Sequence, residues 1–244
     1  MLAKNVIITG CNRGIGHALV EAFMSAGANV WACARKPTVE YEAWLQDLSA
    51  NYGGWAKPVY FDLADADAVN QGIQTILDEG LSVDVLINNA GISTVGLLSM
   101  SKVDDVKALF EVNYFTMLRI IQKVSKKMTR QRHGVIINMG SIAGLEAQPG
   151  KIAYGSSKAA VMLMTRCLAK ELGPVGIRVN AIAPGPIETE MIHQYTDEML
   201  KNLASESSLR RLGRKEEIAQ VALFLASDQA SYINGEIIKV DGGR

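Results

Sequence analysis

Tyr154 and Lys158 are the two side chains of this sequence whose types and spacing point most directly to proton chemistry. They are four residues apart in a stretch, 151–172, that the sequence predicts to be helical, so the phenol and the ammonium share one helix face. A free phenol has a pKa near 10, and proton exchange near neutral pH requires lowering it by about three units, or about 4 kcal/mol. An adjacent ammonium lowers that pKa because it stabilises the phenolate. Helical tyrosine and lysine residues at this spacing are also commonly plain surface neighbours, so the pair depends on its surroundings for its meaning.

A second chemical signal is the glycine-rich segment Thr9–Gly16, which follows a predicted buried strand and leads into a helix. Its glycines, at 10, 14 and 16, would permit a tight turn, let backbone N–H groups approach a pyrophosphate, and let the helix pack closely on the strand. The phosphates would lie at a helix N-terminus, where free amides and the helix dipole favour negative charge. The spacing G-x-x-x-G-x-G differs from the G-x-G-x-x-G dinucleotide fingerprint, and an ordinary strand-to-helix turn is the alternative. Because the segment follows the first buried strand, we favour a dinucleotide site.

The residues after the second predicted strand bear on which dinucleotide would bind. An acidic residue there accepts a hydrogen bond from the ribose 2′-hydroxyl of NAD, whereas a basic residue accommodates the 2′-phosphate of NADP. This strand ends at Ala34 and continues into Arg35 and Lys36, and Arg13 of the glycine-rich segment could reach the same region. Two guanidinium groups on one phosphate would form charge-assisted contacts. The sequence therefore favours NADP(H) over NAD(H); the alternative is that Arg35 and Lys36 only solvate a turn.

Short β-rich runs alternate with longer helical stretches along most of the chain. Several runs contain continuous apolar triplets, which are typical of strands covered on both faces in a parallel sheet. This alternation predicts an α/β fold with right-handed crossovers, namely a doubly wound, Rossmann-type parallel sheet of about seven strands with helices on both faces. The predicted strands are Asn5–Thr9, Ala28–Ala34, Ala56–Phe61, Val83–Ile87, Gly134–Asn138, Arg178–Ile182 and Glu236–Val240. The predicted helices are 14–26, 39–51, 65–79, 102–131, 151–172 and 214–226. No repeat, linker or low-complexity segment divides residues 1–244, so we expect a single domain.

The composition excludes several classes of function. The 244 residues include 25 Lys and Arg against 25 Asp and Glu, which is not the charge signature of a nucleic-acid-binding or anionic-membrane-binding protein. The three cysteines, Cys11, Cys33 and Cys167, show no C-x-x-C spacing and predict reduced thiols without a metal site. The longest apolar runs have six residues, and the N-terminus shows no signal-peptide core. We therefore expect a cytoplasmic protein that uses no metal and acts on neither nucleic acid nor membrane.

Further motifs follow the predicted strands in order along the chain. They are Asp62, Asn88–Gly91, Asn113 in the long helix, Ser141, Pro184–Thr189 and Asp241–Gly243. Together with Thr9–Gly16, Tyr154 and Lys158, these motifs resemble those of the short-chain dehydrogenase/reductase family over essentially the whole chain. The resemblance implies an oxidoreductase that moves hydride between a nicotinamide cofactor and a carbonyl or secondary alcohol.

The resemblance also implies a role for each matching residue. Tyr154 would be the general acid in reduction and the general base in oxidation, and Lys158 would lower its pKa and hold the nicotinamide ribose. Ser141 would hydrogen-bond the substrate oxygen, and Asn113 would position a water that relays protons toward Lys158. The implied catalytic residues are Asn113, Ser141, Tyr154 and Lys158. The implied cofactor-binding residues are Gly10, Asn12, Arg13, Gly14, Ile15, Gly16, Arg35, Asp62, Leu63, Asn89, Ala90, Gly91, Tyr154, Lys158, Pro184, Gly185, Ile187 and Thr189.

Several of these assignments have plainer alternatives. Asn113 could be a helix asparagine satisfied by a nearby backbone carbonyl, and both descriptions can hold together. Asp62, which the resemblance places against the adenine, could instead cap the next helix. Asn88–Gly91 could line the cofactor or tie neighbouring strands together. The resemblance implies that Thr189 contacts the nicotinamide carboxamide and that the backbone of Ile187 contacts the cofactor.

Within the family the chain most resembles 3-oxoacyl-acyl-carrier-protein reductases, which implies NADPH-dependent reduction of a thioester-linked carbonyl. Those enzymes dock an acidic carrier protein on basic residues, and a basic run here ends the long helix, where we expect it on the active-site side of strand five. The run consists of Lys123, Lys126, Lys127, Arg130 and Arg132. It could equally stabilise a helix C-terminus, and a second basic position of the family holds Val175. The alternatives are a reductase or dehydrogenase of a free ketone, sugar or secondary alcohol and, more remotely, a non-catalytic NADP(H)-binding sensor.

The segment 186–212 has weak strand signals and many polar residues. We expect a helical lid over the substrate there, with an unremarkable surface excursion as the alternative. Met191, Ile192 and Tyr195 would give this lid an apolar pocket wall. Family members are usually tetramers, so the resemblance implies a homotetramer with Val106–Met128 and Ala159–Leu172 at its interfaces.

Overall fold

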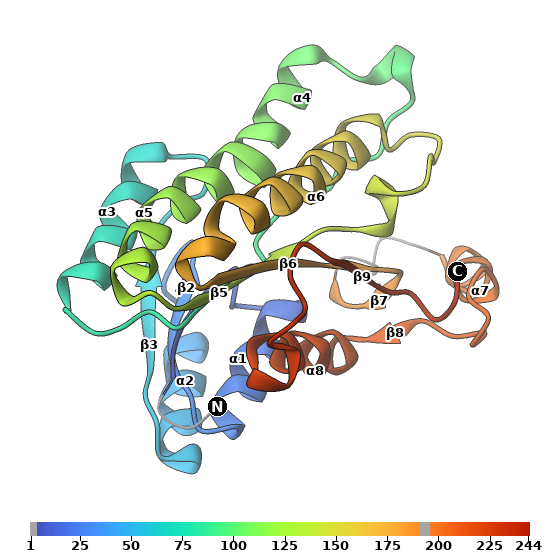
Figure 1. Cartoon of the computed structure of the whole chain (residues 1–244). Helices are drawn as coiled ribbons and strands as arrows, with labels where there is room; N and C mark the ends of the chain where they lie inside the picture. The colour runs from blue at the N-terminus through green and yellow to red at the C-terminus, as the bar shows by residue number, and fades with distance from the viewer. Residues whose placement is uncertain (1–3, 191–195) are drawn as a thin grey trace.

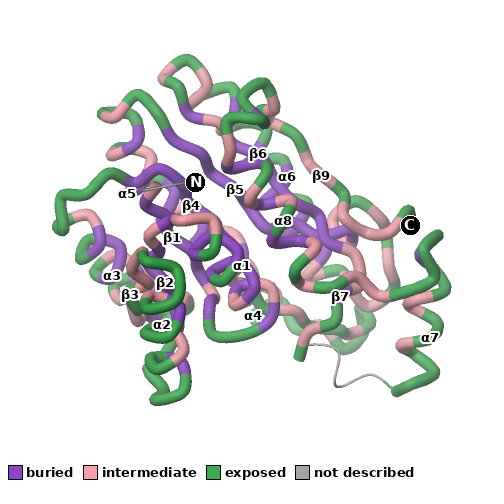
Figure 2. The backbone as a smooth tube through the Cα atoms, turned by 90° about the horizontal axis from the view of Figure 1, so that it is seen from below, coloured by how far each residue is buried: buried purple, intermediate pink, exposed green. Residues whose placement is uncertain are grey.

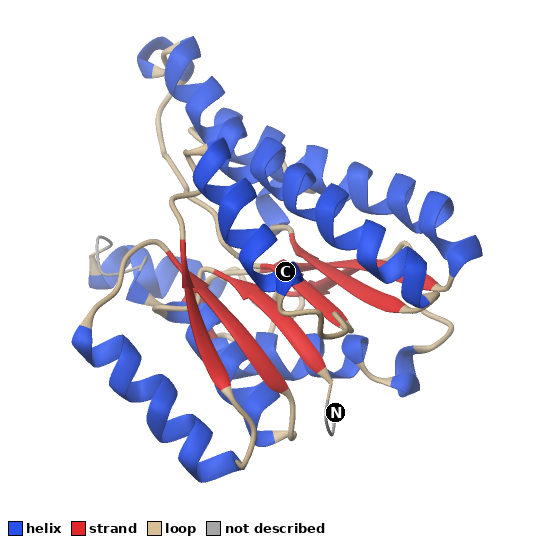
Figure 3. Cartoon of the chain, turned by 90° about the vertical axis from the view of Figure 1, so that its left-hand side faces the viewer, coloured by secondary structure: helices blue, strands red, loops and turns tan. Residues whose placement is uncertain are grey.

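Seven parallel strands form the central sheet of this protein, as predicted. The computed structural model describes residues 4–190 and 196–244. The strand order is β3-β2-β1-β4-β5-β6-β9. Figure 3 shows strands of the sheet lying side by side with helices around them. The strands are β1 (Asn5–Thr9), β2 (Asn29–Ala34), β3 (Ala56–Tyr60), β4 (Val85–Asn88), β5 (Gly134–Met139), β6 (Ile177–Pro184) and β9 (Ile237–Val240). Every residue of β1, β4 and β5 is buried (Figure 2), which explains the continuous apolar runs within these strands.

Helices cover both faces of this sheet (Figure 1). One layer holds α1 (Gly14–Ser25), α2 (Val39–Tyr52) and α8 (Lys215–Ala226). The other layer holds α3 (Ala66–Asp78), α5 (Thr116–Gln131) and α6 (Ile152–Leu172), with α4 (Val103–Phe110) leading into α5. Each layer has its own core, and β1 contributes to both: Val6 and Ile8 pack toward α1 and α8, whereas Ile7 packs toward α3 and α5. The two cores hold the strands in place from both faces of the sheet, and they thereby position the loops that follow the strands.

The strand order reverses between β1 and β4, and this reversal determines where a ligand can bind. The chain runs outward from β1 through β2 to β3, then returns to place β4 beside β1. In open parallel sheets such a reversal opens a crevice at the carboxyl ends of the strands. The glycine-rich loop follows β1, Asn89–Gly91 follow β4, and Ser141 follows β5. The fold thus gathers the predicted site segments at one edge of the sheet.

The long helix predicted over 102–131 is not a single α-helix. Between α4 and α5 the chain makes one π-helical turn, Glu111–Phe115, in which the Thr116 N–H bonds to the Glu111 carbonyl five residues back. This wider turn holds one more residue than an α-turn would. It carries Asn113, whose side chain is fully buried.

The basic run at the end of α5 lies far from the site segments along the sheet. Because α5 is antiparallel to β5, its last turn approaches the amino ends of the strands, where Lys127 Nζ donates to the Gly80 carbonyl at 3.3 Å. Gln131 likewise bonds to the backbone of Val83, just before β4. Ser141 follows the opposite, carboxyl end of β5. The expectation that this run lies on the active-site side of strand five is therefore wrong.

The segment predicted as a lid contains a short helix between two short strands. Here β7 (Ile187–Glu188) pairs with β8 (Gly213–Arg214), and α7 (Asp197–Ser205) begins at its cap Thr196. Its far end is tied to the last residues of the chain: Ser207 Oγ donates to the Gly242 carbonyl, and Glu206 pairs with Arg244 at 2.7 Å. Met191, Ile192 and Tyr195 lie outside the described residues. The lid function stays a prediction.

No helix in the described part of the chain is both long enough and apolar enough to cross a bilayer.

Candidate active site

The glycine-rich loop after β1 is held tightly against both neighbouring strands. Gly10 and Cys11 donate their N–H groups to the Cys33 carbonyl of β2 at 2.9 and 3.0 Å. Gly16 approaches so closely that a β-carbon there would overlap the Gly10 carbonyl oxygen. Gly10 and Gly14 both have positive φ, of 73° and 58°, which glycine adopts without strain. The tight turn and the close packing of the helix on the strand are therefore as the sequence predicted, and the approach to a pyrophosphate stays a prediction.

The N-terminus of α1 has the features of an anion site. Thr38, Asp65 and Thr196 cap α2, α3 and α7 with a side-chain oxygen. Arg13 gives α1 no side-chain cap, as is also true of the N-cap residues of α4, α5 and α6, and the first turn of α1 contains no acidic residue. Its free N–H groups and its dipole thus suit the pyrophosphate of a dinucleotide. Asn12 and Arg13 are exposed beside this turn, and Ile15 is half-buried within it.

The predicted NADP-selective residues lie at the adjoining end of β2. Arg35 directly follows β2 and is exposed, as is Arg13. The hydrogen bonds from Gly10 and Cys11 to Cys33 bring the glycine-rich loop to this strand end. Both guanidinium groups are thus on elements that meet where a ribose 2′-phosphate would lie.

Asp62 and Leu63 follow β3, at the next strand end. Asp62 does not cap α3, because that cap is Asp65, whose Oδ1 accepts from Asp67 N and Ala68 N. Instead Asp62 Oδ1 accepts from Ala64 N at 3.0 Å, which folds the loop into a turn and leaves the side chain exposed. The Leu63 carbonyl accepts from Thr116 Oγ1 at 2.8 Å, which ties this turn to α5.

Asn89 joins the end of β4 to the glycine-rich loop. Its Nδ2 donates to the carbonyls of Thr9 and Gly10 at 2.9 and 3.2 Å. Thr9 Oγ1 in turn accepts from the N–H groups of Asn89 and Ala90, each at 3.1 Å. The preceding Asn88 ties β4 to β5 through Asn138 at 2.9 Å. Of the two interpretations of Asn88–Gly91, the strand-tying one describes these contacts directly.

Asn113 connects three elements through its side-chain amide. Its Oδ1 accepts from Ile92 N at 2.9 Å, and its Nδ2 donates to the Ile92 carbonyl at 2.9 Å and to Ser157 Oγ at 3.1 Å. The interpretation of a backbone-satisfied asparagine therefore holds for this side chain. A β-carbon on Gly91 would lie 3.1 Å from Asn113 Oδ1 and 3.3 Å from Lys158 Nζ. Glycine at 91 thus keeps the space between these two polar atoms open.

Lys158 is an ammonium buried in the interior of the site. Its side chain is 3% exposed, and its Nζ donates to the Met139 carbonyl at 2.7 Å. Burial lowers the pKa of Lys158 to about 8, because the charged form loses its hydration. A positive charge held here is therefore strongly felt by neighbouring groups.

Ser141 and Tyr154 belong to two elements that pack on each other, the turn after β5 and the start of α6. Ser141 is buried and begins the short turn Ile142–Gly144, where its Oγ accepts from Ala143 N at 3.2 Å. That turn packs on α6 at Gly155, where a β-carbon would lie 2.5 Å from the Ala143 carbonyl. Tyr154 is the residue before Gly155 and is half-buried. Since Ser141 Oγ accepts the Ala143 bond, its own O–H proton is left to donate elsewhere.

The segment after β6 closes the site from the other side. Pro184 is the last residue of β6 and is buried, and the Gly185 N–H donates to the Val240 carbonyl at 2.9 Å. Ile187 is buried in β7. The Thr189 side chain lies 3.5 Å from where a β-carbon of Gly14 would stand, so it faces the glycine-rich loop.

Sequence reasoning missed Ser157, which lies between the two predicted catalytic residues of α6. It is fully buried, receives a hydrogen bond from Asn113, and donates to the Tyr154 carbonyl at 2.8 Å. The sequence pattern of apolar residues does not indicate a role for a serine one turn after Tyr154. Its role, to link Asn113 to the Tyr154 carbonyl, is evident only from the structure.

The arrangement combines a phenol, a buried ammonium and a hydroxyl donor at the same edge of the sheet as the uncapped N-terminus of α1. These groups can orient a carbonyl oxygen, donate a proton to it and receive the proton again in reverse. No group of three or more metal-binding side chains occurs within residues 4–190 and 196–244. The residues present fit a nicotinamide dinucleotide in the glycine cradle.

Comparisons with known proteins agree with this geometry. A family model described as enoyl-(acyl carrier protein) reductase matches residues 10–244. The chain is 36% identical to a 3-oxoacyl-[acyl-carrier-protein] reductase, FabG, of Chlamydia trachomatis, covering all of this chain and 98% of the relative. It is 38% identical to the FabG of Thermotoga maritima, covering 98% of this chain and 97% of the relative.

Solved structures show the same likeness. A short chain dehydrogenase/reductase family protein superposes with a TM-score of 0.87 at 33% identity, covering 99% of this chain and 97% of that one. A 3-oxoacyl-[acyl-carrier protein] reductase of Brucella melitensis gives a TM-score of 0.91 at 34% identity, covering 99% of this chain and 91% of that one.

The close approach at Gly16 gives a first test of the cofactor cradle. We expect Gly16→Ala to weaken NADPH binding by at least about tenfold, because the added methyl pushes the loop away from its phosphate-binding shape. Fluorescence titration with NADPH measures this change. Gly53→Ala is the control: Gly53 has nothing within 4 Å, although, unlike Gly16, it has a positive φ of 73°. It is expected to cost about 1 kcal/mol of stability and to leave NADPH binding unchanged. Equal binding by both variants would show that the loop does not hold the dinucleotide.

Burial of Lys158 gives a pH-dependent test. Its pKa is lowered to about 8 in the folded chain, so between about pH 8 and about pH 10 the unfolded chain binds more protons. The free energy of unfolding should therefore rise with pH over this window. We expect Lys158→Met to lose that rise and not to be destabilised near pH 7, where the buried charge costs on the order of 3 kcal/mol. Urea unfolding at both ends of the window measures it.

Lys170→Met, an exposed lysine on the same helix, is the control and should keep the wild-type pH dependence. A Lys158→Met protein that unfolds several kcal/mol more easily than wild type near pH 7 would contradict this account of the buried charge.

Proposed function

This chain belongs to the short-chain dehydrogenase/reductase family, and on that premise we propose that it is an NADPH-dependent reductase of 3-oxoacyl thioesters. The observation that carries the proposal is the convergence of Ser141, Tyr154 and the buried Lys158 beside the uncapped end of α1. The curated relatives, 36% and 38% identical over nearly the full chain, supply the substrate class through their names. The product would be the 3-hydroxyacyl thioester.

The chain's own residues orient the substrate and move one proton. A nicotinamide, when bound, supplies the hydride that reaches the carbonyl carbon. Ser141 donates a hydrogen bond to the carbonyl oxygen and polarises it. Tyr154 transfers its phenolic proton to that oxygen as negative charge develops there. Lys158, 5.9 Å from the Tyr154 ring centroid, stabilises the phenolate that remains.

The phenolate must then regain a proton from solvent. Asn113 Oδ1 retains a second lone pair beside its bond from Ile92 N, and Gly91 leaves the space toward Lys158 open. A water in this space would relay a proton toward Lys158 and Tyr154. Lys158 would also hold the hydroxyls of the nicotinamide ribose, while Thr189, facing Gly14 across the crevice, would contact the carboxamide.

An acyl carrier protein is the proposed carrier of the thioester, because the curated relatives bear that substrate in their names. The proposed location is the cytoplasm. The basic run on α5 lies near the amino ends of the strands, so a carrier bound there would not present its thioester to Tyr154 of the same chain. A homotetramer remains our proposal for the assembly. Phe115 and Leu163, which are large apolar side chains exposed on the π-turn and on α6, support the pairing of helical faces between copies.

The direct test is NADPH consumption with a 3-oxoacyl thioester, presented on coenzyme A and on an acyl carrier protein. We expect turnover with both, and a higher kcat/KM with the carrier. Tyr154→Phe should lower kcat by at least about 100-fold while leaving NADPH binding intact, because only the transferable proton is removed.

Two results of this test would overturn the proposal. Reduction of a free ketone or sugar but not of either thioester would favour the alternative substrate class. NADPH binding without turnover of any carbonyl, unchanged by Tyr154→Phe, would favour a non-catalytic sensor.

The basic end of β2 predicts the choice of cofactor. We expect wild type to prefer NADPH, and Arg35→Asp to reverse this preference, lowering kcat/KM for NADPH by about 10- to 100-fold. The aspartate removes a charge-assisted phosphate contact and can accept from a ribose 2′-hydroxyl. Steady-state kinetics with NADPH and NADH measure the ratio. Arg35→Lys should keep most of the preference, and an unchanged ratio in Arg35→Asp would show that Arg35 only solvates its turn.

A further inference from the structure

Two lysines, not one, lie close to the Tyr154 ring. Lys158 Nζ is 5.9 Å from the ring centroid, and Lys151 Nζ is 5.6 Å from it. Lys158 follows Tyr154 by one helical turn, and Lys151 precedes it by three residues, so both spacings bring the side chain back to the face of the tyrosine. The second lysine has no part in the chemistry described so far.

The position of Lys151 is built by the turn that precedes α6. Lys151 is the N-cap residue of α6, and its carbonyl accepts from Gly155 N at 2.7 Å. Its own N–H donates to the Gln148 carbonyl at 3.2 Å, and the intervening Gly150 has a φ of 76°. The Gly150 carbonyl accepts from Gly96 N at 3.0 Å, which fixes the turn against the loop after β4. Hydrogen bonds from both its N–H and its carbonyl therefore hold the backbone of Lys151 in place.

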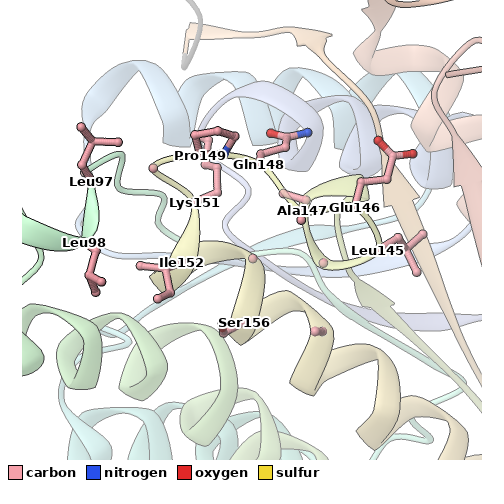
Figure 4. Close-up of a pocket in the computed structure, with 16 residues that line it drawn as sticks. Leu97, Leu98, Leu145, Glu146, Ala147, Gln148, Pro149, Lys151, Ile152 and Ser156 are labelled. Atoms are coloured by element: carbon pink, nitrogen blue, oxygen red, sulfur yellow. The ribbon is translucent and has the colours of Figure 1, made fainter.

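Lys151 is half-buried beside apolar groups. It lines a cavity of about 570 Å³ on the turn before α6, together with Leu97, Leu98, Pro149 and Ile152 (Figure 4). This burial lowers the pKa of Lys151 from its ordinary value. Partial burial leaves the ammonium less screened than a fully hydrated charge, so its field at a neighbouring group is stronger than it would be in water.

The acidic groups around Tyr154 are committed to other partners. Glu146, the acidic residue of the turn between Ser141 and Lys151, pairs with Lys239 and Arg244 at 3.6 and 3.4 Å. Within residues 4–190 and 196–244, Lys151 itself forms no ion pair with a carboxylate.

The remaining elements around the ring add little opposing charge. The loop 91–96 contains no ionisable side chain. On the π-turn Glu111 pairs with Arg119. Beyond β6, Glu188 and Glu190 are both exposed. The charge of Glu188 interacts electrostatically with Arg211. Glu190 lies beside Gly14 of the glycine-rich loop. Lys151 and Lys158 are the charged side chains that lie over the Tyr154 ring.

We propose that Lys151 is a second cation that, together with Lys158, stabilises the phenolate of Tyr154. The inference rests on the proposed function, because it concerns Tyr154 as the residue that exchanges the proton. Lys151 acts through Tyr154 and does not touch the reacting atoms. The ammonium of Lys151 favours ionisation of Tyr154, and it is partly exposed to solvent, whereas the ammonium of Lys158 is buried.

The sign and size of the effect follow from electrostatics. Lys151 Nζ lies 5.6 Å from the ring centroid, so removing this partly solvent-screened cation destabilises the phenolate and should raise the pKa of Tyr154 by about 0.5 to 1 unit. In the oxidative direction Tyr154 must be ionised, so the acidic limb of the pH profile should move upward by this amount. In the reductive direction the protonated form is required, so activity should persist to a correspondingly higher pH.

The test compares Lys151→Met with Lys151→Arg and with Lys170→Met. The pH dependence of kcat/KM is measured for oxidation of a 3-hydroxyacyl thioester with NADP⁺. We expect Lys151→Met to shift the acidic limb upward by about 0.5 to 1 unit, equivalent to a 3- to 10-fold lower rate below the limb. Lys151→Arg should restore the wild-type profile, and Lys170→Met, an exposed lysine farther along the same helix, should not change it.

A second readout does not depend on turnover. Ultraviolet absorbance of tyrosinate is titrated in each variant, with the matching Tyr154→Phe double variant as the blank, so the ionisation of Tyr154 is isolated. This titration keeps its meaning even if the thioester is not the substrate, and so separates failure of this inference from failure of the proposed function. An unchanged Tyr154 titration in Lys151→Met overturns the inference. A rise in KM for the thioester with no shift in either profile also overturns it, and would make Lys151 a substrate-binding residue instead.

Discussion

A positive charge kept in the protein interior is the constraint around which this site is built. Lys158 has lost nearly all its contact with water, and one backbone carbonyl, that of Met139, compensates it. Such a charge is costly to hold, and it is useful only if its field reaches a group whose ionisation matters. Tyr154 is that group. The chain accepts a destabilising residue because the same burial that lowers the pKa of Lys158 strengthens its effect on the phenol.

The surrounding residues keep this charge and its partners in fixed positions. Asn113 ties the π-turn to Ile92 and to Ser157, and Ser157 bonds back to the Tyr154 carbonyl. Asn89 performs a similar function one loop away, where it joins the end of β4 to the glycine-rich loop. The glycine-rich loop and the segment around Tyr154 are therefore both held in place by side-chain amides. Amides suit this task because they donate and accept at once and stay neutral at every working pH.

Much of this could be predicted from the sequence, and the failures have physical causes. Apolar triplets such as Val6-Ile7-Ile8 indicate doubly covered strands, and the glycine spacing indicates a phosphate cradle. Apolar periodicity, however, carries no information on hydrogen-bond register, so the turn Glu111–Phe115 was predicted as plain α-helix. The two-residue strands β7 and β8 are too short to produce a pattern at all. Lys127 was placed at the wrong end of the sheet because a residue run gives charge, whereas its location depends on the direction of α5.

The π-turn also has a consequence for how this helix can change over evolutionary time. Each residue of an α-helix advances the chain by about 100° around the axis, so one additional residue sets α4 and α5 out of phase with each other. Deleting a single codon here would restore a regular helix and rotate every side chain on one side of it relative to the other. Substitutions along α4 and α5 can accumulate one at a time, but a length change cannot. The spacing between the two helices is thus expected to be conserved more strictly than the identity of most residues on them.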